Sequence, residues 1–217
     1  MKTFGRLLSN VWSFLEDTPS QVRVIDPNAP VDVLAIDVSG SMNSNDYAPT
    51  RLEGAKESAR RFIEKRAVIE PNALVGVVTF SRWAHVVSRP IPAMANLSQL
   101  WEAVDSISTS GATNISSGLR RAFEKIQETG SSGYRRVVLL TDGHATHGDN
   151  PIATANQIKS AGIQLDITGI GGSPSEVNER ELKEMASVVN GELRYWFIKS
   201  VGELARKFEA LALREIG

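Results

Sequence analysis

The sequence predicts an α/β domain in which a mainly parallel sheet is covered by helices on both faces. Apolar runs of strand length alternate with segments of helical period along most of the chain. The 217 residues suit one domain with a short appendage, and the composition, 41% hydrophobic and 23% charged, is that of a globular protein. Because a strand-helix alternation requires right-handed crossovers, its strands lie parallel.

Six strands and six helices are expected in order. Apolar runs predict strands over residues 31–36, 74–80, 137–140, 163–170 and 193–198. The run 84–88 follows the second strand too closely for a crossover, so it is expected to be a short antiparallel edge strand. Helical periodicity predicts helices over residues 51–68, 97–106, 115–128, 151–161, 178–189 and 201–216.

The first 30 residues differ from the remainder of the chain. Apolar side chains there fall mostly on one face of a helix, namely Phe4, Leu7, Leu8, Val11, Trp12, Phe14 and Leu15. A linker with Pro27 and Pro30 follows. We therefore expect an N-terminal amphipathic helix and linker over residues 1–30 and a domain over 31–217. The helix is expected to dock on the domain or on a second copy; contact with a membrane surface or a partner remains open.

Composition excludes several function classes. With no cysteine, the chain has no disulfide, zinc-thiolate site or thiol nucleophile. The formal net charge of −1 argues against nucleic acid as the partner. No transmembrane segment is expected, since no stretch approaches about 18 apolar residues, and the N-terminus lacks the unbroken apolar core of a secretory signal. A cytoplasmic location is the resulting expectation.

Polar side chains gather where three segments should open on one edge of the sheet. Asp37, Ser39 and Ser41 follow the first strand, and Asp142 follows the fourth. Thr113 lies in a glycine-containing turn before the helix that starts near residue 115. Ligands of open parallel sheets bind beyond the carboxyl ends of the strands. Taken singly, each residue could be an ordinary turn or helix-cap residue; taken together, they predict a site.

Two carboxylates and three hydroxyls form an all-oxygen ligand set that suits a hard divalent cation. So few carboxylates fit Mg²⁺ better than a Ca²⁺ cage, with Mn²⁺ and Ca²⁺ open as alternatives. Asp37 and Asp142 supply at most two negative charges, so the cation keeps room for an anionic oxygen. A carboxylate from another molecule is the natural candidate.

These residues resemble a known pattern. Asp37-Val38-Ser39-Gly40-Ser41, then Thr113 in SGATNISSGL and Asp142 in VVLLTDGHAT, match in order the metal-ion-dependent adhesion site of von Willebrand factor type A domains. The resemblance covers residues 31–216. It implies a Rossmann-like, three-layer fold in which the serines and the threonine bind the metal directly, the aspartates bind directly or through water, and a partner's Glu or Asp completes the shell.

The resemblance also implies a function without catalysis. Intracellular bacterial relatives commonly act with ATPases of the AAA+ or MoxR type or in stress-related complexes, so we expect a Mg²⁺-dependent protein-binding module. Extracellular adhesion is an alternative. A metal-dependent phosphatase is a weaker one, because Ser39 stands where that mechanism needs a second Asp. His144 and His147 are interpreted as loop residues at the rim, not as a metal pair.

Overall fold

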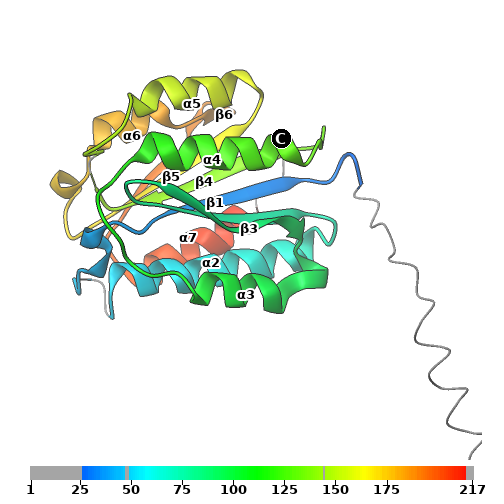
Figure 1. Cartoon of the computed structure of the whole chain (residues 1–217), viewed down its shortest axis with the longest axis horizontal. Helices are drawn as coiled ribbons and strands as arrows, with labels where there is room; N and C mark the ends of the chain where they lie inside the picture. Colours follow the sequence, from blue (N-terminus) through cyan, green and yellow to red (C-terminus); the bar gives the residue numbers. More distant parts are fainter. Residues whose placement is uncertain (1–25, 47–48, 144, 214–217) are drawn as a thin grey trace, which may run out of the picture.

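The computed structural model describes residues 26–46, 49–143 and 145–213. Its centre is a six-stranded sheet in the order β3-β2-β1-β4-β5-β8. Helices lie on both faces, giving the three layers seen in Figure 1. The predicted fold class is confirmed.

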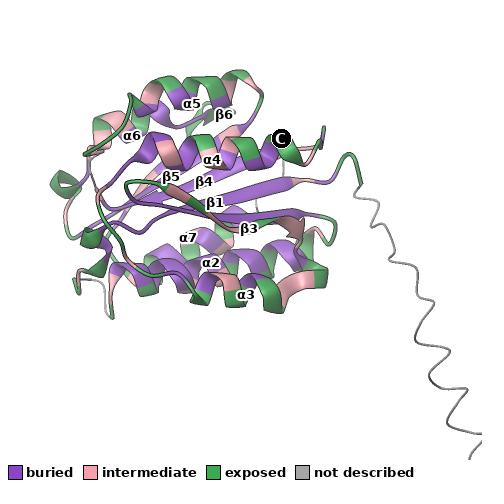
Figure 2. Ribbon diagram, viewed as in Figure 1, coloured by how far each residue is buried: buried purple, intermediate pink, exposed green. Residues whose placement is uncertain are grey.

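The sheet is parallel except at one edge. Its strands are β1 (Val31–Asp37), β2 (Leu74–Phe80), β3 (Ala84–Pro92), β4 (Arg135–Thr141), β5 (Gln164–Ile170) and β8 (Tyr195–Ile198). Only the β2–β3 pair is antiparallel among the described strand pairs of this sheet. Every residue of β1 and β2 is buried (Figure 2), as expected for strands covered on both faces.

The helices divide into two layers. One face carries α2 (Arg51–Ile69), α3 (Leu97–Asp105) and α7 (Val201–Leu213), and the other carries α4 (Ile115–Glu128), α5 (Pro151–Ser160) and α6 (Glu179–Met185) (Figure 1). Each layer buries its own apolar cluster against the sheet. Three short 3₁₀ turns, η1 (Gly40–Asn43), η2 (Met94–Asn96) and η3 (Pro174–Glu176), join the larger elements.

Two elements differ most from the sequence prediction, each by four residues at its end. Strand β3 is longer than expected and continues to Pro92, because an edge strand tolerates prolines whose nitrogens need no ladder partner. Helix α6 ends at Met185, four residues before the predicted end. The chain then forms a hairpin of β6 (Val188–Val189) and β7 (Glu192–Leu193), whose turn residues Asn190 and Gly191 have φ of 50° and 79°.

The ends of the chain lie partly outside the described residues. The predicted N-terminal helix falls in residues 1–25, which the structure does not describe. His144 also lies outside the described residues. The last predicted helix is described up to Leu213, and residues 214–217 lie beyond it.

The topology brings the predicted site residues to one edge. Strands β1 and β4 are parallel neighbours with Ile36 opposite Leu140, so Asp37 and Asp142 leave adjacent strands at the same end. Helix α4 approaches β2 closely at Gly118, where an added Cβ would lie 2.5 Å from a ring carbon of Phe80. That close packing positions the first turn of α4, which begins at Ile115, two residues after Thr113.

Candidate metal site

The loop after β1 is organised by the buried carboxylate of Asp37. The backbone N–H of Ser39 donates to Asp37 Oδ1 at 2.8 Å, and the hydroxyl of Thr141 donates to Oδ2 at 2.6 Å. This local turn directs the next two hydroxyls toward each other, with Ser39 Oγ and Ser41 Oγ 3.1 Å apart. One short segment therefore gathers a carboxylate and two hydroxyls.

Asp142 joins this group from the neighbouring strand. Its Oδ1 accepts a hydrogen bond of 2.8 Å from Ser41 Oγ, and its Oδ2 accepts one of 3.0 Å from Nη1 of Arg51. The carboxylate is buried, like that of Asp37. Four of the five predicted site residues thus form one connected cluster, comprising Asp37, Ser39, Ser41 and Asp142.

The loop that carries Thr113 closes over the first loop. Gly40 N–H donates to the carbonyl of Gly111 at 3.0 Å, and Ser110 N–H donates to that of Val38 at 2.6 Å. Gly111 has a φ of +68°, which favours glycine at this turn. Thr113 Oγ1 lies 3.7 Å from the position a Cβ would take on Gly143, the residue after Asp142. The fifth predicted residue therefore lies beside the other four.

Electrostatics distinguish this cluster from an ordinary turn. Burial and, next, the Asp142 carboxylate raise the pKa of Asp37 from 3.8 to about 7, although hydrogen bonds from Thr141 and Ser39 oppose the change. Burial also raises the pKa of Asp142, against the hydrogen bonds that it accepts from Ser41 and Arg51. Two carboxylates are thus held together out of water at a cost in free energy, which a bound cation would offset.

Arg51 is a member of this site that the sequence analysis did not find. It lies in the first turn of α2, is 6% exposed, and donates to carboxylates from three loops. Besides Asp142, it contacts Asp46 after η1 (Nε to Oδ1, 2.9 Å) and Glu176 in η3 (Nη2 to Oε2, 2.5 Å). Helix starts usually favour negative charge, so an arginine there was a weak signal of acidic neighbours.

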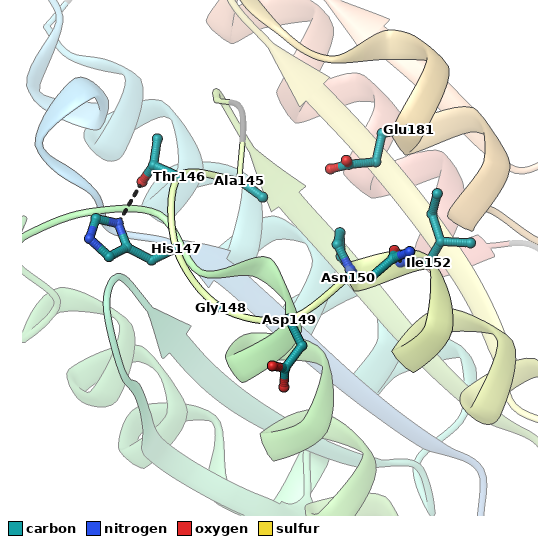
Figure 3. A pocket seen from close by; sticks show the side chains of 9 residues that line it. Ala145, Thr146, His147, Gly148, Asp149, Asn150, Ile152 and Glu181 are labelled. Carbon is teal, nitrogen blue, oxygen red and sulfur yellow. Dashed lines mark hydrogen bonds between the residues drawn. The ribbon is translucent and has the colours of Figure 1, made fainter.

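A pocket of about 340 Å³ opens next to the Thr113 loop, between the β4–α5 loop and α6 (Figure 3). His147 lies in its wall with Nδ1 3.1 Å from the hydroxyl of Thr146. The backbone N–H groups of both residues donate to the carbonyl of Thr113. The pocket is therefore joined to the candidate metal site through backbone contacts, and His147 is a loop residue, as predicted.

The residues at this edge fit a hard divalent cation. Their donors are carboxylate and hydroxyl oxygens, which suit Mg²⁺ and Mn²⁺. Within the part of the chain that the structure describes, no three His, Cys, Asp or Glu residues lie close enough together to hold a metal. A metal bound here therefore needs the serine and threonine hydroxyls as well as the aspartates.

The fold and the clustered hydroxyl and carboxylate oxygens define the class of this protein, a Rossmann-like α/β domain with a polar site at the carboxyl edge of its sheet. Comparison with known proteins identifies the family. The family model of the von Willebrand factor type A domain matches residues 33–144, which is more than half of the chain, so the chain belongs to that family.

The chain is also similar to individual relatives and solved structures. A UPF0353 protein of Mycolicibacterium gilvum is 27% identical over 77% of this chain and 56% of its own length. Calcium-activated chloride channel regulator 1 of Equus caballus is 32% identical, over 75% of this chain but 16% of its own length. The solved structure titled von Willebrand factor type A from Catenulispora acidiphila superposes with a TM-score of 0.71 at 28% identity, covering 85% of this chain and 42% of that one.

The chain spans 56% and 65% of the length of the two curated relatives that match first. Among the described residues, none of the helices combines the length and apolar character needed to cross a bilayer.

Proposed function

We propose that this protein is a Mg²⁺-dependent protein-binding module without catalytic activity, which captures an acidic side chain of its partner. The observation that carries the proposal is the joint geometry of three loops. Ser39 Oγ, Ser41 Oγ and Asp142 Oδ1 are linked by contacts of 3.1 and 2.8 Å, with Asp37 and Thr113 beside them. Single turns or caps do not require hydroxyls and carboxylates from separate loops to converge.

The roles of the residues follow from their chemistry. The hydroxyls of Ser39, Ser41 and Thr113 would bind Mg²⁺ directly, and the carboxylates of Asp37 and Asp142 would bind it directly or through water. Bound Mg²⁺ supplies a positive charge that attracts an anionic oxygen from another molecule. Thr141 and Arg51 would keep the two carboxylates oriented through their hydrogen bonds.

The balance of charge supports an acidic ligand. Asp37 and Asp142 carry at most two negative charges, and the salt bridge from Arg51 to Asp142 offsets part of that charge. A divalent cation held here is therefore not over-neutralised, and a partner's Glu or Asp carboxylate is attracted to it. The pocket beside Thr113 gives the partner a second surface to contact (Figure 3).

The partner and its compartment are further parts of the proposal. We propose a separate polypeptide of the ATPase or stress-related type, in the cytoplasm. This rests on the family resemblance and not on a contact in the structure. Extracellular adhesion is the competing assignment, and it predicts a different set of captured proteins.

Calorimetric titration with MgCl₂ and MnCl₂ tests the metal site. Ser39→Ala and Asp142→Ala should lower the metal affinity at least about 10- to 100-fold, because mutation of residues that only hydrogen-bond to metal ligands already has effects of this size. Ser58→Ala is the matched control, because this buried serine donates to the carbonyl of Gly54 within its own helix. Unchanged affinity in both site variants would refute the metal assignment.

A capture experiment tests the acidic partner. The intact protein is incubated with native cell extract in Mg²⁺, in EDTA, and as the Asp142→Ala variant, and bound proteins are identified by mass spectrometry. The proposal expects a partner in the first condition only. Partners that bind equally in all three would show that the metal does not bridge the two proteins.

A further inference from the structure

We propose that an apolar surface at the amino end of the sheet is the docking site for the N-terminal amphipathic segment of the same chain. This basal patch consists of Val68 and Ile69 in the last turn of α2, Leu213 at the end of α7 and Trp101 in α3. These residues are 65%, 43%, 53% and 37% exposed, respectively. Exposed apolar residues that lie near one another are typical of an interaction surface.

Ion pairs between the helices show how α7 and α3 lie against α2 near Val68. Arg61 of α2 pairs with Glu209 of α7 at 2.8 Å. Both helices run from the carboxyl end to the amino end of the sheet, because each follows a parallel strand. Val68 lies two turns after Arg61, and Leu213 lies one turn after Glu209. The two side chains therefore continue the same seam between α2 and α7.

The other flank of the patch is set by α3. Arg60 of α2 pairs with Asp105 of α3 at 3.2 Å. Helix α3 follows the antiparallel strand β3 and runs opposite to α2, so Trp101, one turn before Asp105, lies nearer the amino end of the sheet. The outer surface of α2 at Val68 thus has an apolar side chain on each side.

The chain enters the domain close to this patch. Pro30, just before β1, accepts a hydrogen bond of 2.7 Å from Leu74 N–H, and Leu74 follows the end of α2 by only five residues. Figure 1 shows the start of β1 and the end of α2 at the same end of the molecule. Asp26 follows Asp17 by nine positions, enough to span about 30 Å when extended. The N-terminal segment can therefore reach the patch.

The N-terminal segment offers an apolar face that could cover the basal patch. Its residues Phe4, Leu7, Leu8, Val11, Trp12 and Leu15 recur at spacings of three and four, which places them on one face of a helix. Docking that face across the α2–α7 seam would remove both apolar surfaces from water within one molecule. Attachment to the same chain makes this contact intramolecular, so it is favoured over the equivalent contact with a second copy at low protein concentration.

The absence of cysteine from the sequence allows a direct test by cross-linking. In the full chain, Val11→Cys is combined with Val68→Cys, and a short bismaleimide is added at low protein concentration. The control combines Val11→Cys with Gln127→Cys, since Gln127 is exposed in the last turn of α4, on the opposite face of the sheet. We expect a cross-linked monomer with the Val11→Cys and Val68→Cys pair and at least about tenfold less with the control pair.

Three results would overturn the proposal. Cross-linked dimers in place of monomers would assign the patch to a second copy. Equal cross-linking of both pairs would mean that the segment does not select this surface. A lack of cross-linking in both pairs would mean that the segment does not dock on the patch. The patch would then be assigned to another partner, such as a membrane surface.

A second measurement avoids cysteine variants. Val68→Asp changes an exposed residue and should leave the domain folded, which circular dichroism checks. Trypsin should then cleave the chain after Arg6 about tenfold faster than in the unmodified protein, because an aspartate cannot replace the apolar contact. Gln127→Asp is the control and should not alter that rate. Equal cleavage rates in all three proteins would contradict docking on this patch.

Discussion

The two ends of the central sheet each bury a pair of aspartates, but they balance these charges in opposite ways. At the amino end, Asp32 of β1 and Asp166 of β5 are fully buried. Asp32 accepts hydrogen bonds of 2.7 and 2.6 Å, and Asp166 accepts bonds of 2.8, 3.1 and 3.4 Å from guanidinium groups. Two carboxylates there meet three arginines, namely Arg66, Arg136 and Arg194.

The arginines at this end are in excess. Nη2 of Arg66 and Nη2 of Arg136 are buried without a hydrogen-bond partner. Arg136 also donates to the carbonyl of Leu211 in the last turn of α7, at 2.9 Å, and stacks over the ring of Phe62 at 5.2 Å. This cluster ties the sheet to α2 and α7, and its negative charges are fully matched.

At the carboxyl end the balance is reversed. Asp37 and Asp142 have one arginine between them, and Arg51 also serves Asp46 and Glu176. The other groups around the two carboxylates are the hydroxyls of Ser39, Ser41 and Thr141, which add no positive charge. A charge-matched cluster holds a fold together, whereas a cluster with surplus negative charge is suited to bind a cation. Strand β1 supplies one aspartate to each end, Asp32 to the charge-matched cluster and Asp37 to the proposed metal site.

The largest effect on stability is expected at the amino end of the sheet, in the charge-matched cluster. Asp166→Ala leaves the buried Arg194 without this carboxylate and removes one of the two carboxylates that Arg136 contacts, so the free energy of unfolding should fall by about 3–5 kcal/mol. Urea denaturation measures this value. Asp105→Ala, which removes a partner of Arg60 in a more exposed pair, is the control and should cost less than about 1 kcal/mol. A loss below about 1 kcal/mol in Asp166→Ala, as small as that of the control, would mean that the amino-end cluster does not stabilise the fold.

Removing Arg51 should have a smaller and metal-dependent effect. Arg51→Met leaves the carboxylate of Asp142 without its charged partner, so we expect a loss of about 2–3 kcal/mol in the metal-free protein. Added Mg²⁺ should raise the melting temperature more in this variant than in the unmodified protein, because more negative charge is uncompensated. A smaller rise would instead show that Arg51 holds Asp142 in the position that binds metal. Arg61→Met, at an exposed pair, is the control.

Asp37 provides a test by pH. Its pKa is raised to about 7 in the folded protein, from 3.8 in the unfolded chain, so protonation favours the fold. The contribution is fully present below pH 3.8 and is lost as the pH rises through 7. Asn cannot titrate, and its amide can still accept from Ser39 N–H and donate to Thr141 Oγ1. In EDTA, the stability of the unmodified protein minus that of Asp37→Asn should therefore fall by about 1.4 kcal/mol per pH unit between about pH 4 and 7.

The stability difference between the two proteins should be constant above about pH 8. A difference that does not vary with pH would show that the pKa of Asp37 is not raised in the folded protein. Asp37→Asn should also lose the stabilisation by Mg²⁺ that the unmodified protein is expected to have, because it lacks one of the two site carboxylates.

The contrast between the two ends also marks what the sequence could predict. Asp37, Ser39 and Ser41 follow a buried strand in close succession, and Asp142 follows the neighbouring one, so their position at the carboxyl edge follows from the strand pattern alone. Whether they bind metal stays a prediction. The matched cluster was not found, because its residues are single charges within apolar strands, such as Asp32 and Arg136, that only the sheet register brings together.

Arg51 was missed for a related reason. Its partner Glu176 lies 125 residues further along the chain, and no local pattern links the two. The end of α6 was predicted four residues too late because the apolar residues Val188 and Val189 fit a helical period as well as a strand. The Asn190-Gly191 dipeptide was the local signal for the hairpin that replaces the last turn.

The smallest effect is expected at the rim of the site. Glu176 is 41% exposed in its side chain and bonds both Arg51 and the N–H of Gly172. In Glu176→Gln the amide oxygen can still accept from both groups, so the loss of stability should stay below about 1 kcal/mol, and Mg²⁺ affinity should change little. Urea denaturation and calorimetric titration measure the two effects. A loss as large as that of Arg51→Met would contradict this view, since it would mean that the arginine serves mainly to hold the rim loop and not the buried carboxylate of Asp142.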